Sequence, residues 1–340
     1  MSLFANFLNS WPAYCKHQVI NNIVKEWKKF ASKILPTKIF IASLPITDSN
    51  ADDVLIKSAL DFYDKNLSQW ISQKSSFGII YQYPCRFQND HEDSKFKFLH
   101  ESHINQHVSL VLFCPKSETL KLQQMLTRTR FHWYRKLSKS PMKSGFQTNL
   151  NGNENLFQIG YQPKRPIFDE SITLDTIRLN CGEQNSLQDV DIISCNSNLH
   201  NCLLAFLDDC FTRNDEEKIV MKLNPQLVPF KLAINIDSDG CKAIGHRKLL
   251  EVAEHLIGLL EEYPDISIFP FTPDNPITID QCDRLAVKYC IILTEETLRT
   301  GIIHLRNRDT TISEQIHISN LLKTILFYLQ PEKLITYVDK

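Results

Sequence analysis

The chain has 340 residues, 43% of them hydrophobic and 10% aromatic, so it is long enough for two domains with apolar cores. Its formal net charge of −1 at pH 7 neither favours nor excludes a polyanionic partner. The ten cysteines include no CxxC pair, which argues against a zinc ribbon and favours reduced, buried thiols inside the cell. No apolar run approaches the roughly 20 residues that span a bilayer, so we expect no integral membrane protein.

The N-terminal segment contains no acidic residue before Glu26. This composition is compatible with a mitochondrial transit peptide, but the absence of arginine from the first 85 residues weakens that interpretation. The alternative, which we favour, is an ordinary amphipathic helix over residues 18–34.

The first part of the chain alternates short apolar runs with helical patterns. We predict strands over residues 37–48, 77–83, 108–113, 156–161 and 172–179, helices over 51–71 and 118–136, and a strand followed by a helix over 192–211.

A charged stretch at residues 212–218 and the prolines Pro225 and Pro229 predict a domain junction at about residue 222. Beyond it we predict strands over 230–236, 266–271, 290–293 and 301–305, helices over 245–262 and 278–289, and a hairpin over 294–300. Thr311 and Glu314 have the spacing of a capping box, which predicts a final helix beginning there. This order favours a small layered domain with a largely parallel sheet.

The glycine pattern excludes several nucleotide sites. No two of the nine glycines are closer than five residues, so neither GxGxxG nor a phosphate-binding loop is present. The chain also lacks GxSxG and HExxH. We therefore expect no cofactor and no catalytic site.

Three histidines, His100, His103 and His107, have the spacing of one helix face and form the best candidate metal site. The alternative is a solvent-exposed, histidine-rich loop or strand edge. We favour this alternative because the flanking residues are polar, and we predict no metal.

A basic tract lies between Glu118 and Glu154, where the sequence has no acidic residue. Its candidate DNA-binding residues are Arg128, Arg130, Arg135, Lys136, Lys139 and Lys143, interleaved with aromatic residues at 131–134. Cations release counterions from a phosphate backbone and aromatic rings stack on bases, so one interpretation is a nucleic-acid surface. The other is a solvated helix face whose aromatic residues lie in the core. Lys164 and Arg165 extend the tract under the first interpretation.

Four segments resemble the accessory (processivity) subunit family of mitochondrial DNA polymerase gamma, which is related to class II aminoacyl-tRNA synthetases. They are WYRKLSKSP, NSNLHNCLLAFLDDCF, KLNPQLVPFKLAINI and ETLRTGIIHLRNRDTTISEQIHIS, and the resemblance covers roughly residues 130–335. It implies an α+β domain over residues 1–221, like a class II synthetase core with an antiparallel sheet and helices. It also implies an α/β, anticodon-binding-like domain with a mixed sheet over residues 222–340. Because the glycine-rich third motif of an active synthetase is missing, we expect the first domain to be catalytically inactive.

The resemblance further implies a non-catalytic subunit of the mitochondrial matrix and nucleoid. We expect it to bind the catalytic polymerase subunit and double-stranded primer-template DNA, and to raise processivity in mitochondrial DNA replication. Vertebrate relatives dimerise through a helical insertion that this sequence does not show, so we expect a monomer pairing one to one with the catalytic subunit. The alternative function is a tRNA-binding, synthetase-like enzyme or regulator.

The LRxRD segment of the family matches the second candidate surface. Its candidate polymerase-contacting residues are His304, Arg306, Arg308 and Asp309. For the two arginines the alternative is local: ion pairing with Asp309 that shapes the turn.

Overall fold

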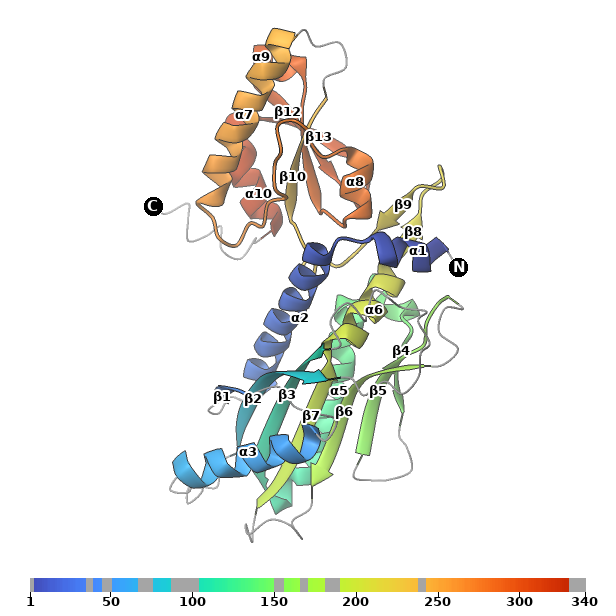
Figure 1. Cartoon of the computed structure of the whole chain (residues 1–340), viewed down its shortest axis with the longest axis vertical. Helices are drawn as coiled ribbons and strands as arrows, with labels where there is room; N and C mark the ends of the chain where they lie inside the picture. Colours follow the sequence, from blue (N-terminus) through green and yellow to red (C-terminus); the bar gives the residue numbers. More distant parts are fainter. Residues whose placement is uncertain are drawn as a thin grey trace. The chain divides into compact units, whose positions relative to one another are not determined.

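The computed structural model describes residues 3–34, 39–44, 51–66, 76–86, 104–149, 156–165, 171–180, 190–237 and 243–329. The chain divides into two compact units, Met1–Asp209 and Cys210–Lys340 (Figure 1). The first unit ends at Asp209 rather than at residue 221. The reason is that β8 (Phe211–Arg213) pairs with β9 (Ile219–Met221), and β9 lies against α8 (Ile279–Arg284) of the second unit.

The first unit is built on a seven-stranded sheet of order β1-β2-β3-β7-β6-β5-β4. The strands are β1 Ile39–Ser43, β2 Phe77–Arg86, β3 Ile104–Pro115, β4 Phe146–Asn149, β5 Leu156–Tyr161, β6 Ile172–Asn180 and β7 Val190–Asn198. Within this sheet only the β1–β2 pair is parallel, so the expected α+β domain with an antiparallel sheet and helices is confirmed.

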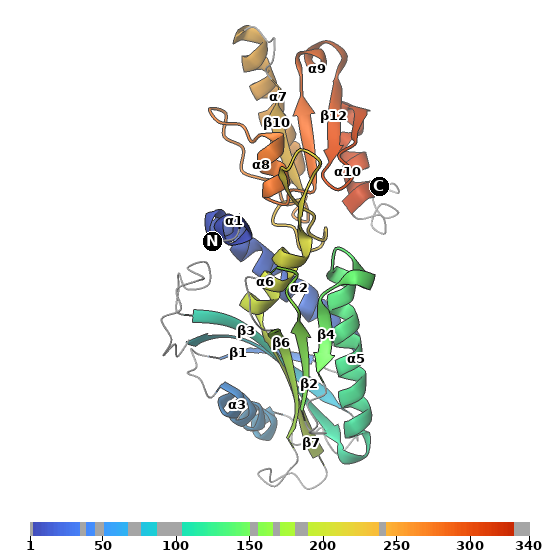
Figure 2. The ribbon, with the colours of Figure 1, turned by 90° about the vertical axis from the view of Figure 1, so that its right-hand side faces the viewer.

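Helices cover both faces of this sheet (Figure 2). The helices of this unit are α1 Leu3–Ser10, α2 Ala13–Ile34, α3 Ala51–Asn66, α5 Thr119–Leu137 and α6 Leu199–Cys210, with 3-10 turns η3 Lys116–Glu118 and η4 Pro141–Lys143. Tyr63 of α3 stacks on Phe77 and Phe113 of the sheet, with ring centroids 5.9 and 5.3 Å away. On the opposite face, the Trp27 indole of α2 donates to the Ser197 hydroxyl of β7 at 2.9 Å.

Two element boundaries in this unit have local causes. Strand β2 runs through Pro84 to Arg86, although the proline predicted an earlier end. Strand β1 ends opposite Gln82, so Pro84 lies where β2 has one neighbouring strand and a missing N–H is tolerated. Helix α6 begins after Asn198, whose side-chain oxygen accepts from the backbone N–H groups of His200 and Asn201 at 3.0 and 3.2 Å.

The second unit contains a four-stranded sheet of order β10-β11-β12-β13. Its strands are β10 Leu232–Ile236, β11 Tyr289–Leu293, β12 Ile302–Asn307 and β13 Ser313–His317, and its other helices are α7 Ala243–Glu261, α9 Glu295–Thr300 and α10 Leu321–Leu329, preceded by the 3-10 turn η5 Ile318–Asn320. The β10–β11 pair is parallel and the other two pairs are antiparallel. The mixed sheet is thus confirmed, whereas the prediction of a largely parallel sheet is wrong.

Alternate residues of the central strands point to opposite faces of this sheet. Leu232 and Ile291 belong to the apolar cluster under α7 and α10, whereas Ala233 and Cys290 belong to the cluster beside α8. The second unit therefore has helices on both sides of one small sheet.

The predicted hairpin at residues 294–300 is helix α9. The Thr297 hydroxyl accepts from the Thr294 N–H at 3.1 Å at the start of this helix. At its end, the Gly301 N–H donates to the Thr297 carbonyl at 2.9 Å, and Gly301 has φ +69°. Gly301, with its left-handed backbone, ends helix α9 and reverses the direction of the chain. The prediction had assigned this reversal to a hairpin.

The predicted capping box at Thr311 and Glu314 does not form. Thr311 has φ +61°, residues 313–317 pair with β12, and the Glu314 carboxylate accepts from the Tyr328 hydroxyl at 2.7 Å. Tertiary strand pairing has overridden a local helix signal, and α10 begins only at Leu321.

Two further elements are shorter than predicted. Residues 266–271 contribute one isolated bridge, from Ile268 to Leu232, instead of a strand. The helix predicted to reach Tyr289 ends at Arg284, because Ala286 has φ +61° and turns the chain into β11.

Candidate nucleic-acid and partner surfaces

The outer side of α5 carries a row of positive side chains. Lys121, Arg128, His132 and Lys136 are exposed at spacings of seven, four and four residues, the repeat of one helix face. Lys139 follows α5 and Lys143 lies in η4, and both are exposed. Between Glu118 and Glu154 the sequence has no carboxylate, so no acidic side chain of α5 itself or of the loop after it lies among the cations of this α5 face.

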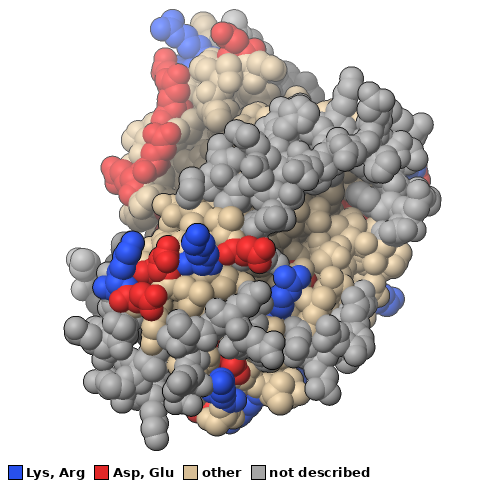
Figure 3. All heavy atoms as spheres, turned by 60° about the horizontal axis from the view of Figure 1, so that its bottom comes forward, with Lys and Arg blue, Asp and Glu red and all other residues tan. Residues whose placement is uncertain are grey.

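Other described surfaces are electrically mixed. On the side of the molecule drawn in Figure 3, lysine and arginine side chains stand beside aspartate and glutamate side chains among the described atoms. Helix α3 shows the same mixture, with Asp53, Lys57, Asp61 and Asp64 all exposed. The concentration of one sign on the α5 face is therefore local.

Arg130 does not belong to this surface, which corrects its prediction as a DNA-binding residue. Its side chain is fully buried and its Nε donates to Asp175 at 2.7 Å. The guanidinium also lies 4.0 Å from the Trp133 ring and 5.2 Å from the Trp27 ring. Burial opposes the charged form, but the Asp175 carboxylate outweighs it, so the pKa of Arg130 is raised. Arg130 is an internal cation that supports α5.

Two of the four aromatic residues of the basic tract, Trp133 and Tyr134, lie in the core. Trp133 is 9% exposed and Tyr134 is fully buried, with its ring 5.3 Å from Phe146 and 6.0 Å from Phe206. The Tyr134 hydroxyl donates to Asp175 at 2.6 Å. The Trp133 and Tyr134 rings pack in the core beneath α5, so they present no exposed face on which an unpaired base could stack.

Arg135 shapes the loop after α5. Its Nε donates to the Pro141 carbonyl at 2.9 Å, and its guanidinium lies 5.6 Å from the Phe131 ring. The side chain is half-buried. Arg135 thus holds the loop that carries Lys139 and Lys143 while keeping part of its charge at the surface.

Two aspartates at the end of α6, Asp208 and Asp209, bond to the loop after α5 and to the segment after β5. The Asp209 carboxylate accepts from the Ser138 hydroxyl at 2.9 Å, from the Lys139 N–H at 2.7 Å and from the Lys164 ammonium at 2.5 Å. The Asp209 side chain is 1% exposed. The end of α5 is therefore fixed by a buried carboxylate.

Asp208 plays the same part for the segment after β5. It accepts from the Tyr161 hydroxyl and the Lys164 N–H at 2.8 Å each, and from Arg165 at 2.5 Å. Lys164 and Arg165 are therefore neutralised by ion pairs and do not extend the positive surface, contrary to the prediction.

Of the three histidines considered as a metal site, only His107 lies among the described residues, and it is not on a helix. His100 and His103 lie outside the described residues, and His107 is on strand β3, with its ring 5.6 Å from that of Tyr83. Burial and the neighbouring His200 lower the pKa of His107 to about 4. Across the described ranges, no group of three or more histidine, cysteine, aspartate or glutamate side chains is placed to hold a metal ion.

A polar cavity of about 580 Å³ opens on the sheet face that α3 covers in part. Its lining includes Tyr83, His107, Thr176, Arg178 and Asn196. The volume suits a small molecule, but among the described lining residues Arg178 is the one cationic side chain and there is no glycine. A polyphosphate therefore has little to hold it here.

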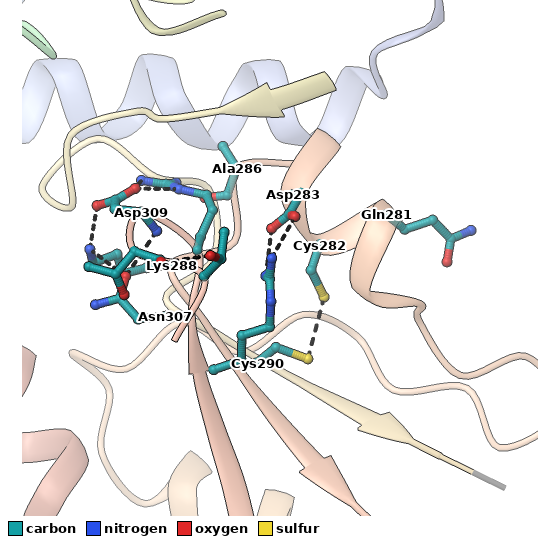
Figure 4. Close-up of polar contacts among 12 residues, drawn as sticks. Gln281, Cys282, Asp283, Ala286, Lys288, Cys290, Asn307 and Asp309 are labelled. Carbon is teal, nitrogen blue, oxygen red and sulfur yellow. Dashed lines mark hydrogen bonds and ion pairs between the residues drawn. The ribbon is translucent and has the colours of Figure 1, made fainter. Parts of the chain in front are cut away.

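In the second unit, Arg306 of β12 pairs with Asp283 of α8 instead of reaching the surface. Figure 4 labels Asp283 and marks its hydrogen bonds with dashed lines. The two terminal nitrogens of Arg306 donate to the two Asp283 oxygens at 2.7 and 2.8 Å, and both side chains are about 10% exposed. Burial opposes the charged form, but the hydrogen bonds and charge of Asp283 raise the pKa of Arg306. This bidentate pair joins sheet and helix.

Arg308 is still more enclosed, with 1% of its side chain exposed. It donates to the Ala286 carbonyl at 2.7 Å, to the Leu223 carbonyl at 2.6 Å and to Asp309 at 2.8 Å. Burial raises the pKa of Asp309, but Arg308 and Lys288 outweigh this and hold it below its usual range. The alternative in which the arginine pairs with Asp309 is therefore present for Arg308, whereas Arg306 pairs with Asp283. Neither guanidinium is available for a polymerase contact.

His304 and Asp309 remain partly exposed. His304 lies on β12 between Ile292 of β11 and Gln315 of the edge strand β13, on the sheet face that also carries Arg306. The Asp309 side chain is 34% exposed beside Lys288. Of the four predicted interface residues, these two keep surface that a partner could reach.

The family model of the anticodon binding domain matches residues 278–327, from the start of α8 into α10. Over 323 residues, the chain is 25% identical to DNA polymerase subunit gamma-2 of Mus musculus, covering 85% of this chain and 68% of the relative. The bovine protein of that name is 24% identical over 327 residues, covering 86% of this chain and 65% of the relative. The chain is thus similar to DNA polymerase gamma accessory subunits over most of its length.

Two further relatives carry the same protein name. The Xenopus laevis relative, named as mitochondrial, is 24% identical over 288 residues, covering 76% of this chain and 60% of the relative. The Drosophila melanogaster relative, also named as mitochondrial, is 29% identical over 120 residues. The chain thus spans about two thirds of the length of the mammalian relatives. Among the parts of the chain described, no helix is both long and apolar enough to cross a membrane.

The residues that sequence reasoning missed are the buried acids that hold these arginines and lysines. Asp175 lies 45 residues from Arg130, and Asp283 lies 23 residues from Arg306. No local pattern links such pairs. One signal was available: Asp208 and Asp209 end an otherwise apolar helix, where an unpaired carboxylate would be costly.

Proposed function

We propose that this protein is a non-catalytic accessory subunit of a mitochondrial DNA polymerase. It binds the catalytic subunit and double-stranded primer-template DNA in the matrix nucleoid and raises the processivity of mitochondrial DNA replication. It pairs as a monomer, one to one, with the catalytic subunit. The observation that supports DNA binding most directly is the α5 face with the loop after it, where five lysine and arginine side chains are exposed and no acidic residue occurs in the sequence.

The chemistry of this face suits a phosphate backbone. Helix α5 has 19 residues and is therefore about 28 Å long, which matches about eight base pairs of duplex. Lysine and arginine contacts to phosphate position a protein on DNA without reading its sequence. Because Trp133 and Tyr134 are buried, stacking on unpaired bases contributes little, and the duplex is the better ligand.

Processivity follows from slower dissociation. A polymerase that is held to its template by extra cationic contacts leaves it less often, although the chemical step is unchanged. The second unit supplies the contact with the catalytic subunit, and His304 and Asp309 are its candidate contact residues. Arg306 and Arg308 act from inside that unit by holding its strands and turns in place.

The test is primer extension by the catalytic subunit with and without this protein over a salt titration. We expect longer products per binding event and synthesis that persists to higher salt. The combined variant Arg128→Ala, Lys136→Ala, Lys139→Ala should lose most of this gain. The matched control is Lys57→Ala, an exposed lysine on α3 across the sheet. Equal product lengths with and without the protein at every salt concentration would refute the proposal.

A second candidate is a tRNA-binding, synthetase-like enzyme or regulator. It is favoured by the match to the anticodon binding domain and by the polar cavity on the first sheet. Pyrophosphate exchange with ATP and the common amino acids separates the two functions. The accessory-subunit proposal predicts no exchange, because the chain has no glycine-rich phosphate site.

A further inference from the structure

The loop at residues 138–145 is fixed at both ends and exposed in the middle. At its start the Ser138 hydroxyl donates to Asp209, and at its end the Gly145 carbonyl accepts from the Gln162 N–H at 2.8 Å. A side chain at Gly145 would place its Cβ 2.3 Å from the Gln162 carbonyl oxygen, so only glycine allows this approach. Between the anchors, Met142 is 87% exposed.

Three serines in this loop have different surroundings. Ser138 is 4% exposed and bonded to Asp209, and Ser144 donates to the Pro141 carbonyl at 3.3 Å. Ser140 is partly exposed, and its hydroxyl makes no hydrogen bond to another described residue. Ser140 is therefore the serine of the loop whose hydroxyl is best placed to meet an enzyme from solution.

The residues after Ser140 are Pro141, Met142 and Lys143. A proline immediately after the serine and a basic residue three positions after it are the features that cyclin-dependent and related proline-directed kinases select. We propose that Ser140 is a phosphorylation site of a proline-directed kinase, and that the phosphate weakens duplex binding by the α5 face. The second half of this inference rests on the proposed function.

The modification is an ordinary phosphoryl transfer. The Ser140 Oγ attacks the γ-phosphorus of ATP, the bond to the β-phosphate oxygen breaks, ADP leaves, and the hydroxyl proton passes to the kinase base. The kinase requires an extended segment, so the turn η4 must open. That turn is closed by the hydrogen bond from the Lys143 N–H to the Ser140 carbonyl, 2.9 Å long. A single exposed turn opens at small cost.

The charge change falls in the middle of the positive surface. A phosphoserine carries about −1.5 to −2 charges at pH 7 and pairs strongly with cations. Lys139 is its neighbour in sequence, Lys143 is three residues away, and the side chain of Arg135 is bonded to Pro141. The side chains of Lys139 and Lys143 would then bind the phosphate on Ser140 instead of the phosphates of DNA. Loss of two DNA phosphate contacts lowers the slope of log affinity against log salt by about 2.

The experiment treats the full-length protein with ATP and a cyclin-dependent kinase and maps the phosphate by mass spectrometry. Affinity for a 25-base-pair duplex is then measured by fluorescence anisotropy at several salt concentrations. We expect phosphate at Ser140, its absence from Ser140→Ala, and its retention in the matched variant Ser144→Ala. Duplex affinity at 0.1 M salt should fall on the order of 10- to 100-fold.

The outcomes are separable. No phosphate at Ser140 overturns the inference, whatever the protein does with DNA. Phosphate at Ser140 with unchanged affinity also overturns it, while the proposed function stands if Arg128→Ala and Lys136→Ala weaken binding. If the unmodified protein binds no duplex at all, the DNA-binding part of the proposed function fails, yet the mapped phosphate still confirms the modification site. The variant Ser140→Glu should mimic part of the loss of affinity.

Discussion

Arg130 and Asp175 form a salt bridge of 2.7 Å in which neither side chain is exposed to solvent. Two residues away in sequence, Arg128 is exposed on the α5 face. Residue type and sequence neighbourhood are the same for both arginines, but helix geometry directs one into the core and the other to the surface. Mutation should therefore affect stability at Arg130 and duplex affinity at Arg128.

Arg130→Ala should destabilise the first unit by about 3–5 kcal/mol, because it leaves the buried Asp175 carboxylate without its cation. Urea unfolding followed by circular dichroism measures the change. Arg128→Ala should change stability by less than about 0.5 kcal/mol while reducing duplex affinity. A stable Arg130→Ala protein would show that the ion pair is dispensable.

Asp209→Asn tests whether the buried carboxylate positions the loop after α5. Removal of a negative charge near lysines would by itself strengthen DNA binding. We expect the opposite, a weaker affinity for duplex, because Ser138 and the Lys139 N–H lose part of their anchor. Asp64→Asn, at an exposed site on α3, is the matched control for charge alone. Anisotropy titrations give both affinities, and a gain for Asp209→Asn would contradict the positioning role.

Arg308→Lys should destabilise the second unit by about 2–4 kcal/mol although the charge is kept. One ammonium cannot replace a planar group that reaches Leu223, Ala286 and Asp309 in three directions. Hydrogen exchange should show the loss as faster exchange of the amides around Leu223 and Ala286. Unchanged protection there would mean that the guanidinium fork is not required. Lys323→Arg, an exposed site on α10, controls for the exchange of one cation for the other.

His107 makes the first unit sensitive to mild acid. Burial lowers its pKa from 6.5 to about 4 in the folded protein, so the unfolded chain binds the proton more readily. Its contribution to stability is complete above about pH 6.5 and is lost progressively as the pH falls toward 4. Unfolding free energies at pH 7, 6, 5 and 4 should show this decline, and His107→Asn should reduce its slope. His200, whose pKa is also lowered to about 4, would leave a residual decline in that variant.

Much of the fold follows from periodic apolar patterns. Strand β5 occupies the predicted residues, and α5 differs from its predicted range by one residue at each end. These elements have patterns that no tertiary contact contradicts. The helix predicted to begin at Thr311 was wrong because Thr311 and Glu314 have the spacing of a capping box, while pairing with β12 decides the conformation of residues 313–317. The prediction for residues 294–300 was wrong because a helix of six residues is too short for its period to be seen.

The candidate surfaces were predictable only in part. Composition located the basic tract, but it could not distinguish Arg130 from Arg128, because the acid that selects Arg130 is on a distant strand. In the same way, the LRxRD resemblance located Arg306 and Arg308 without revealing that both are bonded inside their own unit. Long-range pairing is the information that a single sequence lacks.

Gly301 has a consequence for genetic screens of this protein. Its backbone is left-handed, and a Cβ there would lie 2.7 Å from the Nε2 atom of His317. Any substitution must therefore displace the His317 ring of β13 and hold a left-handed backbone that other residues rarely adopt, even if nothing outside the chain ever touches residue 301. On a mutational map, loss-of-function alleles at Gly301 and Arg308 would lie near the candidate partner residues His304 and Asp309. They should be scored as folding alleles, and suppressed by low temperature or by raised protein levels, before they are used to draw an interface.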